Sequence, residues 1–217
     1  LLVASRARLI HGNLLLALPE LDANQRLAIA HDFWRNITWN VLEWLKISSL
    51  TTEWIRRNVL FENVQVLDLA LGEGRGVLLH SGHFGNWELC AMAISTRYQV
   101  AAVVRPQKNP YLDAWHNKNR GLFNMRILNH HQAVRETQEW LRNNGCVGIL
   151  MDQNLYKGGV FVDFFGKPAA TTSLTALLHL RTQSPIIGVY QRRQGLKHIV
   201  RFERIEAPSW NGSLGKN

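Results

Sequence analysis

Short runs of β-branched and apolar residues alternate with helical patterns from residue 64 onward, and this alternation constrains the fold more than any other feature of the sequence. Alternating strands and helices favour an α/β layer fold around a largely parallel sheet. The runs 77–79 and 147–151 are apolar throughout, which is typical of strands that are covered on both faces. We therefore predict a mixed, largely parallel sheet flanked by helices.

The same patterns place the individual elements of this sheet. We expect helices over residues 87–97, 110–123, 132–143 and 171–182. Gln194 and Gly195 separate the last two strands, which predicts a hairpin at an edge of the sheet. The expected strands cover residues 64–69, 76–80, 100–105, 146–152, 161–164, 186–191 and 198–205.

The first sixty residues have a helical pattern. Apolar residues recur at spacings of three and four over residues 21–47, where Asp22 or Asn24 can cap the helix, and a shorter helix is expected over 51–60. We predict a helical segment, 1–60, that packs on an α/β domain, 61–217, the two forming one domain. Amphipathic indole rings favour membrane interfaces, and core packing is the alternative use of the four tryptophans here: Trp34, Trp39, Trp44 and Trp54.

The charge balance of the chain limits the classes of partner. The 217 residues include 25 Lys and Arg against 16 Asp and Glu, a net charge of +9. This excess predicts attraction to nucleic acid, an anionic membrane surface or an acidic protein. Two cysteines, Cys90 and Cys146, exclude a disulfide framework and a four-cysteine zinc site. No run approaches the ~18 apolar residues of a membrane span, but the chain begins at Leu1, so we expect a piece of a longer protein.

One segment, residues 77–89, combines the features of a catalytic site. His83 follows a buried strand between Gly82 and Gly85, and Glu88 falls in the first turn of the next helix. Active sites of open α/β sheets lie beyond the carboxyl ends of strands. A carboxylate at Nδ1 would leave Nε2 free to take a proton from a hydroxyl, and the helix N-terminus at Asn86 offers N–H groups to an oxyanion. A histidine satisfied within a turn is the alternative.

The segment from His83 to Glu88 resembles the HxxxxD/E motif of the glycerolipid and lipid A acyltransferase superfamily, and its HFGNWE form resembles the lipid A biosynthesis (lauroyl/myristoyl) acyltransferases. The resemblance covers residues 60–206. Family members normally begin with a membrane helix and end with a Pro- and Trp-containing segment, and they commonly have a small residue or proline in place of Asp163. The further blocks that agree in order are Arg105-Pro106, Asn109-Pro110, Arg120, Asp152-Gln153-Asn154, 160–166, 169–172 and Pro185.

The resemblance implies a glycerolipid acyltransferase-like fold and an enzyme of late lipid A acylation. The acyl chain would pass from an acyl carrier protein thioester to a hydroxyl of a glycolipid acceptor, without a metal or organic cofactor. His83, with Glu88, would deprotonate the hydroxyl, and the alkoxide would attack the thioester directly. The expected place is the cytoplasmic face of a Gram-negative inner membrane, with the helical segment 1–60 close to the membrane surface and an anchor in the full-length protein. The expected substrate-binding residues are Arg105, Arg120, Asp152 and Asn86.

Each of these assignments has an alternative. Arg105 and Arg120 could hold a phosphate or stabilise an oxyanion, or lie on a solvated helix face. Asp152 ends an apolar strand and could orient a substrate or an arginine, or cap a turn. Cationic residues of the last two strands could dock an acidic carrier protein or protect an edge strand; they are Arg192, Arg193, Lys197, Arg201 and Arg204, with Arg181 nearby.

Other functions are disfavoured by missing patterns. Ser81 lacks the Gly-x-Ser-x-Gly elbow of a serine hydrolase, and His130-His131 have no metal ligands at suitable spacing. An acyltransferase for another lipid, such as a mannosylated phosphoinositide or an ornithine-type lipid, is the nearer alternative. A non-catalytic basic module that binds nucleic acid is the distant one, because recognition-helix and stacking-platform patterns are missing.

Overall fold

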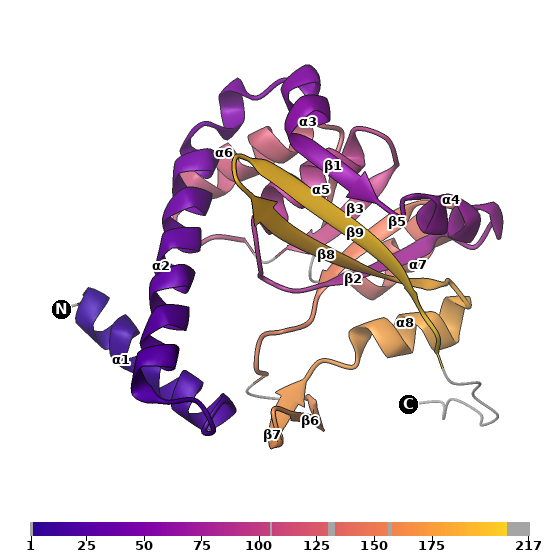
Figure 1. The fold of residues 1–217 in the computed structure, drawn as a ribbon. Helices are drawn as coiled ribbons and strands as arrows, with labels where there is room; N and C mark the ends of the chain where they lie inside the picture. Colours follow the sequence, from indigo (N-terminus) through magenta and orange to yellow (C-terminus); the bar gives the residue numbers. More distant parts are fainter. Residues whose placement is uncertain (1, 105, 130–132, 156–157, 208–217) are drawn as a thin grey trace. The chain divides into compact units, whose positions relative to one another are not determined.

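The computed structural model describes residues 2–104, 106–129, 133–155 and 158–207 (Figure 1). Contacts between residues divide the chain into two units: residues 1–47 with 154–172, and residues 48–153 with 173–217. The division falls after Ile47, whereas the sequence suggested residue 60, and it joins 154–172 to the N-terminal helices. The packing of an N-terminal segment on the α/β domain stays a prediction.

The larger unit contains a seven-stranded sheet with the order β1-β9-β8-β2-β5-β3-β4 (Figure 1). Every neighbouring pair is parallel except β8 and β9, which are antiparallel. The predicted fold class, a mixed and largely parallel α/β sheet, is confirmed. The strands are β1 (Val59–Glu62), β2 (Val77–Ser81), β3 (Val100–Val104), β4 (Arg126–Asn129), β5 (Cys146–Leu150), β8 (Ile186–Gln194) and β9 (Lys197–Ile205).

Helices cover both faces of this sheet. Leu78 of β2 is fully buried with Leu141 and Leu178, which belong to the neighbouring helices α7 and α8. The next residue, Leu79, lines a pocket with residues of α5, and successive residues of a strand point to opposite faces. The helices of this unit are α3 (Thr52–Asn58), α4 (Gln65–Gly72), α5 (Trp87–Ser95), α6 (Pro110–Gly121), α7 (Ala133–Arg142) and α8 (Leu174–Thr182), with the 3-10 turn η1 (Ile47–Ser49) at the boundary between the units.

The strand predicted over 64–69 is wrong, because this segment forms helix α4. Leu67 and Ala70 are fully buried, whereas Leu69 is 71% exposed. A strand would place Leu67 and Leu69 on one face, so only the helical spacing buries the right side chains. The β-branched residues that favoured a strand are overridden by packing against the sheet.

Two further strands were misplaced or missed at the sheet's margins. Residues 59–62 form the edge strand β1, although we expected the end of a helix there. Because β1 pairs with β9, the β8–β9 hairpin is not an edge, and protection of an edge no longer explains its cations. Strand β4 at the opposite edge is too short and polar to stand out in the sequence.

The smaller unit consists of the helices α1 (Leu2–Ala17) and α2 (Ala23–Leu45) and an antiparallel hairpin, β6 (Val160–Phe164) with β7 (Lys167–Thr171). Asp22 caps α2, because its side chain accepts a hydrogen bond from the backbone N–H of Gln25. The side chain of Gln25 in turn accepts a hydrogen bond from the backbone N–H of Asp22. The amphipathic character predicted for the N-terminal helices stays a prediction. None of the helices in the described ranges is both long and apolar enough to cross a membrane.

Candidate active site

The parallel pairing of β2 with β5 brings two loops together at the carboxyl edge of the sheet. Ser81 pairs with Leu150 at the last position of this ladder, so both chains leave the sheet side by side. His83 follows β2 and Asp152 follows β5. The Nδ1 atom of His83 lies 2.7 Å from Oδ1 of Asp152, and the backbone N–H of His83 donates to Oδ2 at 2.6 Å. One carboxylate therefore fixes both the ring and the backbone of His83.

A glycine at position 82 makes this close approach possible. A Cβ on Gly82 would lie 2.9 Å from the ring of Phe84 and 3.0 Å from Oδ2 of Asp152. Real Cβ atoms avoid such distances, so a side chain here would push Asp152 away from His83. Gly82, which the sequence suggested for a sharp turn, therefore also leaves room for the carboxylate of Asp152.

Glu88 is not the carboxylate at Nδ1, and the pairing predicted for it is wrong. Its two oxygens accept hydrogen bonds from Arg120 of α6, from Nε at 3.0 Å and from Nη2. Asn117 accepts a further bond from Nη1 of Arg120 at 3.3 Å. Because α5 begins at Trp87, Glu88 lies in its first turn, where the planar guanidinium of α6 matches the carboxylate with two bonds.

This pairing also changes the interpretation of Arg120. The residue is only 8% exposed, and its guanidinium is occupied by Glu88 and Asn117. A buried charge requires such a partner, so the pair serves to join α5 and α6. The neighbouring His116 has its pKa lowered by burial and by the cation of Arg120, which keeps its imidazole neutral at neutral pH.

The second ring nitrogen of His83 faces Gln153. The side-chain Nε2 of Gln153 lies 3.4 Å from Nε2 of His83. When Nδ1 carries the proton toward Asp152, Nε2 is the basic nitrogen and the amide donates to it. The edge of Trp87 packs near the imidazole at 5.2 Å between ring centres. This arrangement leaves a partly exposed imidazole with a polar side chain at each ring nitrogen.

The remaining predicted site residues have different surroundings. Asn86 is 5% exposed and caps α5, since its Oδ1 accepts the N–H of Leu89 at 3.0 Å. Arg105 lies outside the described residues, as do His130 and His131. Among the described residues, no group of three or more His, Cys, Asp or Glu side chains could hold a metal ion.

A residue that the sequence analysis missed, Gln191 of β8, supports the turn that carries His83. Gly85 has a φ of +58°, and a Cβ on it would lie 2.5 Å from Oε1 and 2.7 Å from the backbone oxygen of Gln191. The Gln191 side chain is buried and lies 2.6 Å from Nδ1 of the fully buried His198. The two glycines of the motif were the only sequence signal for this close approach.

A small apolar pocket, partly open to solvent, adjoins the same turn. Phe84 and Trp87 of the motif contribute to its wall, and Gly148 of β5 lies on its floor of strands. Burial raises the pKa of Cys90, another lining residue, to about 12, so its thiol is protonated at neutral pH. Apolar side chains therefore line a hollow next to the turn that carries His83.

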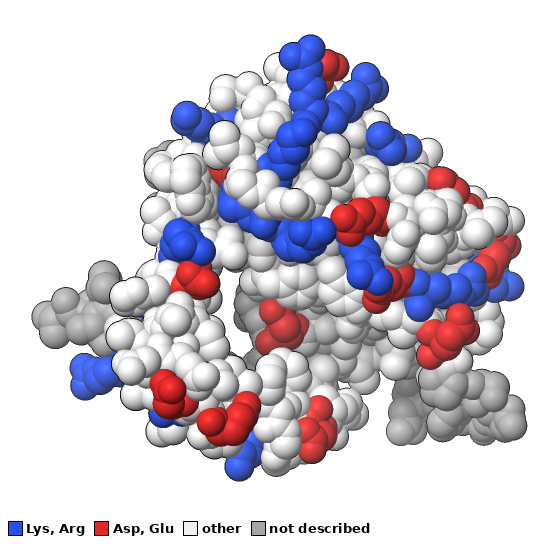
Figure 2. All heavy atoms as spheres, viewed as in Figure 1, with Lys and Arg blue, Asp and Glu red and all other residues white. Residues whose placement is uncertain are grey.

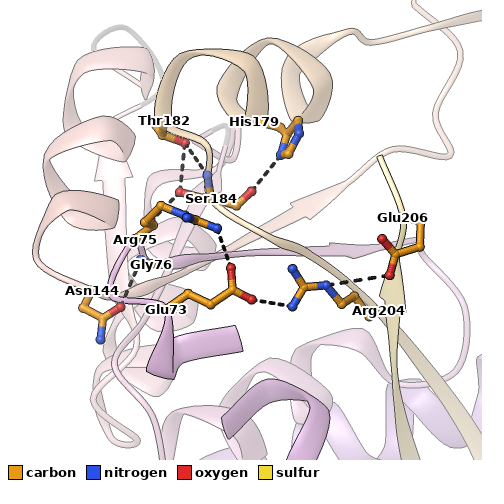
Figure 3. Close-up of polar contacts among 9 residues, drawn as sticks. All are labelled: Glu73, Arg75, Gly76, Asn144, His179, Thr182, Ser184, Arg204 and Glu206. Carbon is orange, nitrogen blue, oxygen red and sulfur yellow. Dashed lines mark hydrogen bonds and ion pairs between the residues drawn. The ribbon is translucent and has the colours of Figure 1, made fainter. Parts of the chain in front are cut away.

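A second polar cluster lies at the amino end of β2 and holds structure together (Figure 3). Glu73 accepts bonds from Arg75 and from Arg204 of β9, and the bond from Arg204 is the main cause that lowers the pKa of Glu73. Ser184 donates to the backbone oxygen of Arg75 at 2.5 Å. The cluster therefore ties the turn before β2 to the end of the last strand.

The predicted cations of β8 and β9 are partly neutralised. Figure 2 shows Lys and Arg side chains gathered over these strands, with Asp and Glu among them. Arg192 pairs with Glu62 at 3.2 Å, and Arg201 pairs with Glu203 at 2.5 Å. This surface therefore carries side chains of both charges, with more positive than negative ones.

The contact between His83 and Asp152 thus lies at the carboxyl edge of an α/β sheet and next to an apolar pocket. The model of the bacterial lipid A biosynthesis acyltransferase family matches residues 2–213. The chain belongs to this family of acyltransferases, which confirms the resemblance seen in the sequence.

Known relatives support the same family. A lipid A biosynthesis acyltransferase of Haemophilus influenzae is 27% identical over 189 residues, 84% of this chain and 58% of the relative. A phosphatidylinositol mannoside acyltransferase of Mycobacterium tuberculosis is 28% identical over 131 residues, 57% of this chain and 41% of the relative. A phosphatidylinositol mannoside acyltransferase of Mycolicibacterium smegmatis is 25% identical over 141 residues, which are 60% of this chain and 46% of the relative. The chain spans about half the length of these relatives.

Proposed function

We propose that this protein transfers a fatty acyl chain from a thioester to a hydroxyl of a glycolipid, with His83 as the general base. The observation that carries the proposal is the 2.7 Å contact between Nδ1 of His83 and Asp152. The carboxylate holds the tautomer that has a basic Nε2 and stabilises the imidazolium that forms. Family membership supplies the acyl-transfer chemistry.

The proposed reaction is direct and balanced. The acceptor hydroxyl donates its proton to Nε2 of His83 as its oxygen forms a bond to the thioester carbonyl. The tetrahedral intermediate collapses, the carbon–sulfur bond breaks, and Nε2 returns the proton to the leaving thiolate. An ester and a free thiol result, without a covalent enzyme intermediate.

Gln153 has a part in this proposal. Its amide lies 3.4 Å from Nε2, where the acceptor hydroxyl must bind. Displacement by the hydroxyl would free the amide to donate to the developing oxyanion, beside the N–H groups at the start of α5. Arg105 is kept as a proposed ligand for a phosphate of the substrate.

Glu88 and Arg120 would act as positioning residues. Their paired hydrogen bonds hold the first turn of α5, and with it the segment that contains His83, against α6. Asn86 would contribute by capping the same helix, since its Oδ1 holds the N–H of Leu89. In this proposal the motif's two charged residues perform different tasks, His83 the proton transfer and Glu88 the support.

We propose a lipid A precursor as the acceptor and an acyl carrier protein thioester as the donor, at the cytoplasmic face of the inner membrane. The family description and the Haemophilus relative favour this acceptor. The net charge of +9 fits both an acidic carrier protein and a phosphorylated lipid. A mannosylated phosphoinositide is the second candidate, favoured by the mycobacterial relatives.

The test is an acyl-transfer reaction with the purified chain. Acyl-loaded carrier protein would be mixed with either a tetra-acylated lipid A precursor or a phosphatidylinositol mannoside, and the lipids analysed by mass spectrometry. We expect one added acyl chain on the lipid A precursor with wild type and none with His83→Ala. Transfer only to the phosphatidylinositol mannoside would show that the mannoside, and not the lipid A precursor, is the acceptor. Equal transfer by wild type and His83→Ala would overturn the mechanism.

A further inference from the structure

The hairpin β6–β7 exposes apolar side chains along the whole of its first strand. All five residues of β6 are exposed, and four of them are apolar: Val160, Phe161, Val162 and Phe164. Phe161 is 76% exposed, and Phe165 in the turn is 55% exposed. Apolar side chains gathered in this way on a surface mark an interaction site.

These side chains point to both sides of the hairpin. Val160, Val162 and Phe164 share one face of β6, and Phe161 lies on the other, because successive residues alternate. Phe165 continues the apolar surface around the turn, where its ring packs edge-on against Phe164 at 4.7 Å. A flat protein surface would cover only one of these faces, whereas a lipid phase surrounds all of them.

The charge at the tip is compatible with an apolar surrounding. Asp163 is the acidic residue of β6, and its Oδ1 accepts the N–H of Gly166 at 2.8 Å within the turn. Lys167 begins β7, and a lysine can extend its ammonium to the headgroups while its stem stays among apolar groups. The chain's net charge of +9 adds attraction to an anionic bilayer.

The area available argues against a second protein as the occupant. An aromatic side chain buries about 150–250 Å² at most. Three partly exposed phenylalanines and two half-exposed valines fall short of the roughly 800 Å² that each partner of a stable interface buries. A membrane interface has no such minimum, because apolar side chains partition into it individually.

The backbone of the hairpin limits how deeply it can enter a bilayer. The two strands pair with one another from Val160 with Thr171 to Phe164 with Lys167. Near the base, Ala170 is also bonded to Leu155 and to the side chain of Asn154. The outer edge of β6 still requires polar partners, which water and headgroups supply at the boundary of a bilayer but its hydrocarbon core does not.

We propose that the tip of the β6–β7 hairpin, residues 160–166, inserts into the headgroup–acyl boundary of an anionic phospholipid membrane. The inference rests on the proposed function, since an enzyme that acylates a glycolipid must reach an acceptor held in a bilayer. It assigns the membrane contact to this hairpin.

The test compares two side chains of equal exposure. Phe161→Ser and Leu196→Ser each remove a side chain that is 76% exposed, one on this hairpin and one between β8 and β9. The 217-residue chain would be sedimented with vesicles of phosphatidylethanolamine and phosphatidylglycerol. We expect Phe161→Ser to lower the partition coefficient at least about tenfold, because the transfer free energy of a phenylalanine side chain out of water is lost. Phe161→Leu should retain most of the binding. Unchanged binding by Phe161→Ser, or an equal loss with Leu196→Ser, would overturn the proposal.

A labelling experiment reports insertion without relying on a loss. Because Cys90 and Cys146 are buried, a single added cysteine can carry an environment-sensitive fluorophore. Phe164→Cys should show a blue shift and a rise in emission when vesicles are added, and Leu196→Cys should show neither. No change at position 164, or an equal response at position 196, would contradict insertion of the tip.

Activity separates this proposal from the proposed function. Phe161→Ser should keep wild-type turnover with a short-chain, water-soluble acceptor and lose turnover with an acceptor in vesicles. Equal loss with both acceptors would assign Phe161 to the reaction itself and overturn the membrane role. Failure of His83→Ala to reduce turnover would refute the catalytic mechanism but leave the vesicle result standing.

Discussion

The imidazole of His83 has one nitrogen on a carboxylate and the other beside an amide. Asp152 accepts from the ring at 2.7 Å and from the backbone at 2.6 Å, so the ring has little freedom to turn. Gln153 follows directly in sequence and lies at Nε2. A single loop after β5 therefore supplies the contacts on both sides of the imidazole.

Replacement of Gln153 tests the role of that amide. Without it, a developing oxyanion would lose a hydrogen-bond donor, so we expect Gln153→Ala to lower kcat by about 10²-fold while KM changes little. Steady-state acyl transfer gives both constants. Gln65→Ala, an exposed glutamine on α4, serves as the matched control. A change confined to KM would assign Gln153 to substrate binding and contradict the oxyanion role.

At the scale of elements, the join between α5 and α6 depends on one largely buried ion pair. The side chains of Arg120 and Glu88 are 10% and 16% exposed. Removal of one partner leaves a charge with little water, so we expect Glu88→Gln and Arg120→Met each to lower the free energy of unfolding by up to about 3 kcal/mol.

Urea denaturation of the single variants and of the double variant measures this coupling. The double variant should be less destabilised than the sum of the two single ones. Additive losses would mean that the two side chains act independently. That result would contradict the coupling that their paired hydrogen bonds indicate.

The pocket gives a prediction about chain length. Gly148 lines it, and a Cβ there would meet only the backbone oxygen of Ala101 at 3.8 Å. A larger side chain can therefore be added at the expense of pocket volume. We expect Gly148→Val to shift the preferred acyl donor to a shorter chain, measured as kcat/KM over donors of increasing length. A uniform loss for all donors would show that the pocket does not hold the acyl chain.

Elements with a strong pattern were predictable, and the contacts between them were not. The apolar runs at 77–79 and 147–151 became the central strands β2 and β5, and the turn with His83 followed at the expected edge. Glu88 was chosen as the partner of His83 because it is near in sequence. Asp152 lies 69 residues away, and only the pairing of β2 with β5 brings it to the ring.

At the scale of the whole molecule, the two ends of the sheet have different tasks. The carboxyl ends of β2 and β5 hold the proposed base, and the amino end of β2 is tied to β9 by Glu73 and its two arginines (Figure 3). The sequence indicated the first end, because glycines and a histidine follow an apolar strand. It gave no sign of the second, because the partners of Glu73 are ordinary charged residues until the sheet has formed.

The Glu73 cluster makes the stability of the molecule depend on pH. The bond from Arg204 lowers the pKa of Glu73 below its ordinary value of 4.5, so the folded state favours the ionised carboxylate. Its contribution is present above pH 4.5 and is lost as the pH falls through the lower, folded pKa.

We expect Glu73→Gln to be less stable than wild type at pH 7 by no more than about 1 kcal/mol, because the cluster is partly exposed. The difference should vanish in acid. Thermal denaturation of both proteins from pH 7 to pH 3 tests this, and a difference that persists at low pH would show that the Glu73 carboxylate acts through packing alone.

The most direct test of the central claim is the kcat of acyl transfer by Asp152→Asn. The asparagine keeps the size of the side chain and removes the charge that stabilises an imidazolium on His83. We predict that kcat falls by about 10²–10⁴-fold, with the thermal unfolding transition unchanged, while Asp32→Asn, which removes an exposed carboxylate on α2, keeps the wild-type rate. A wild-type kcat for Asp152→Asn would contradict the account.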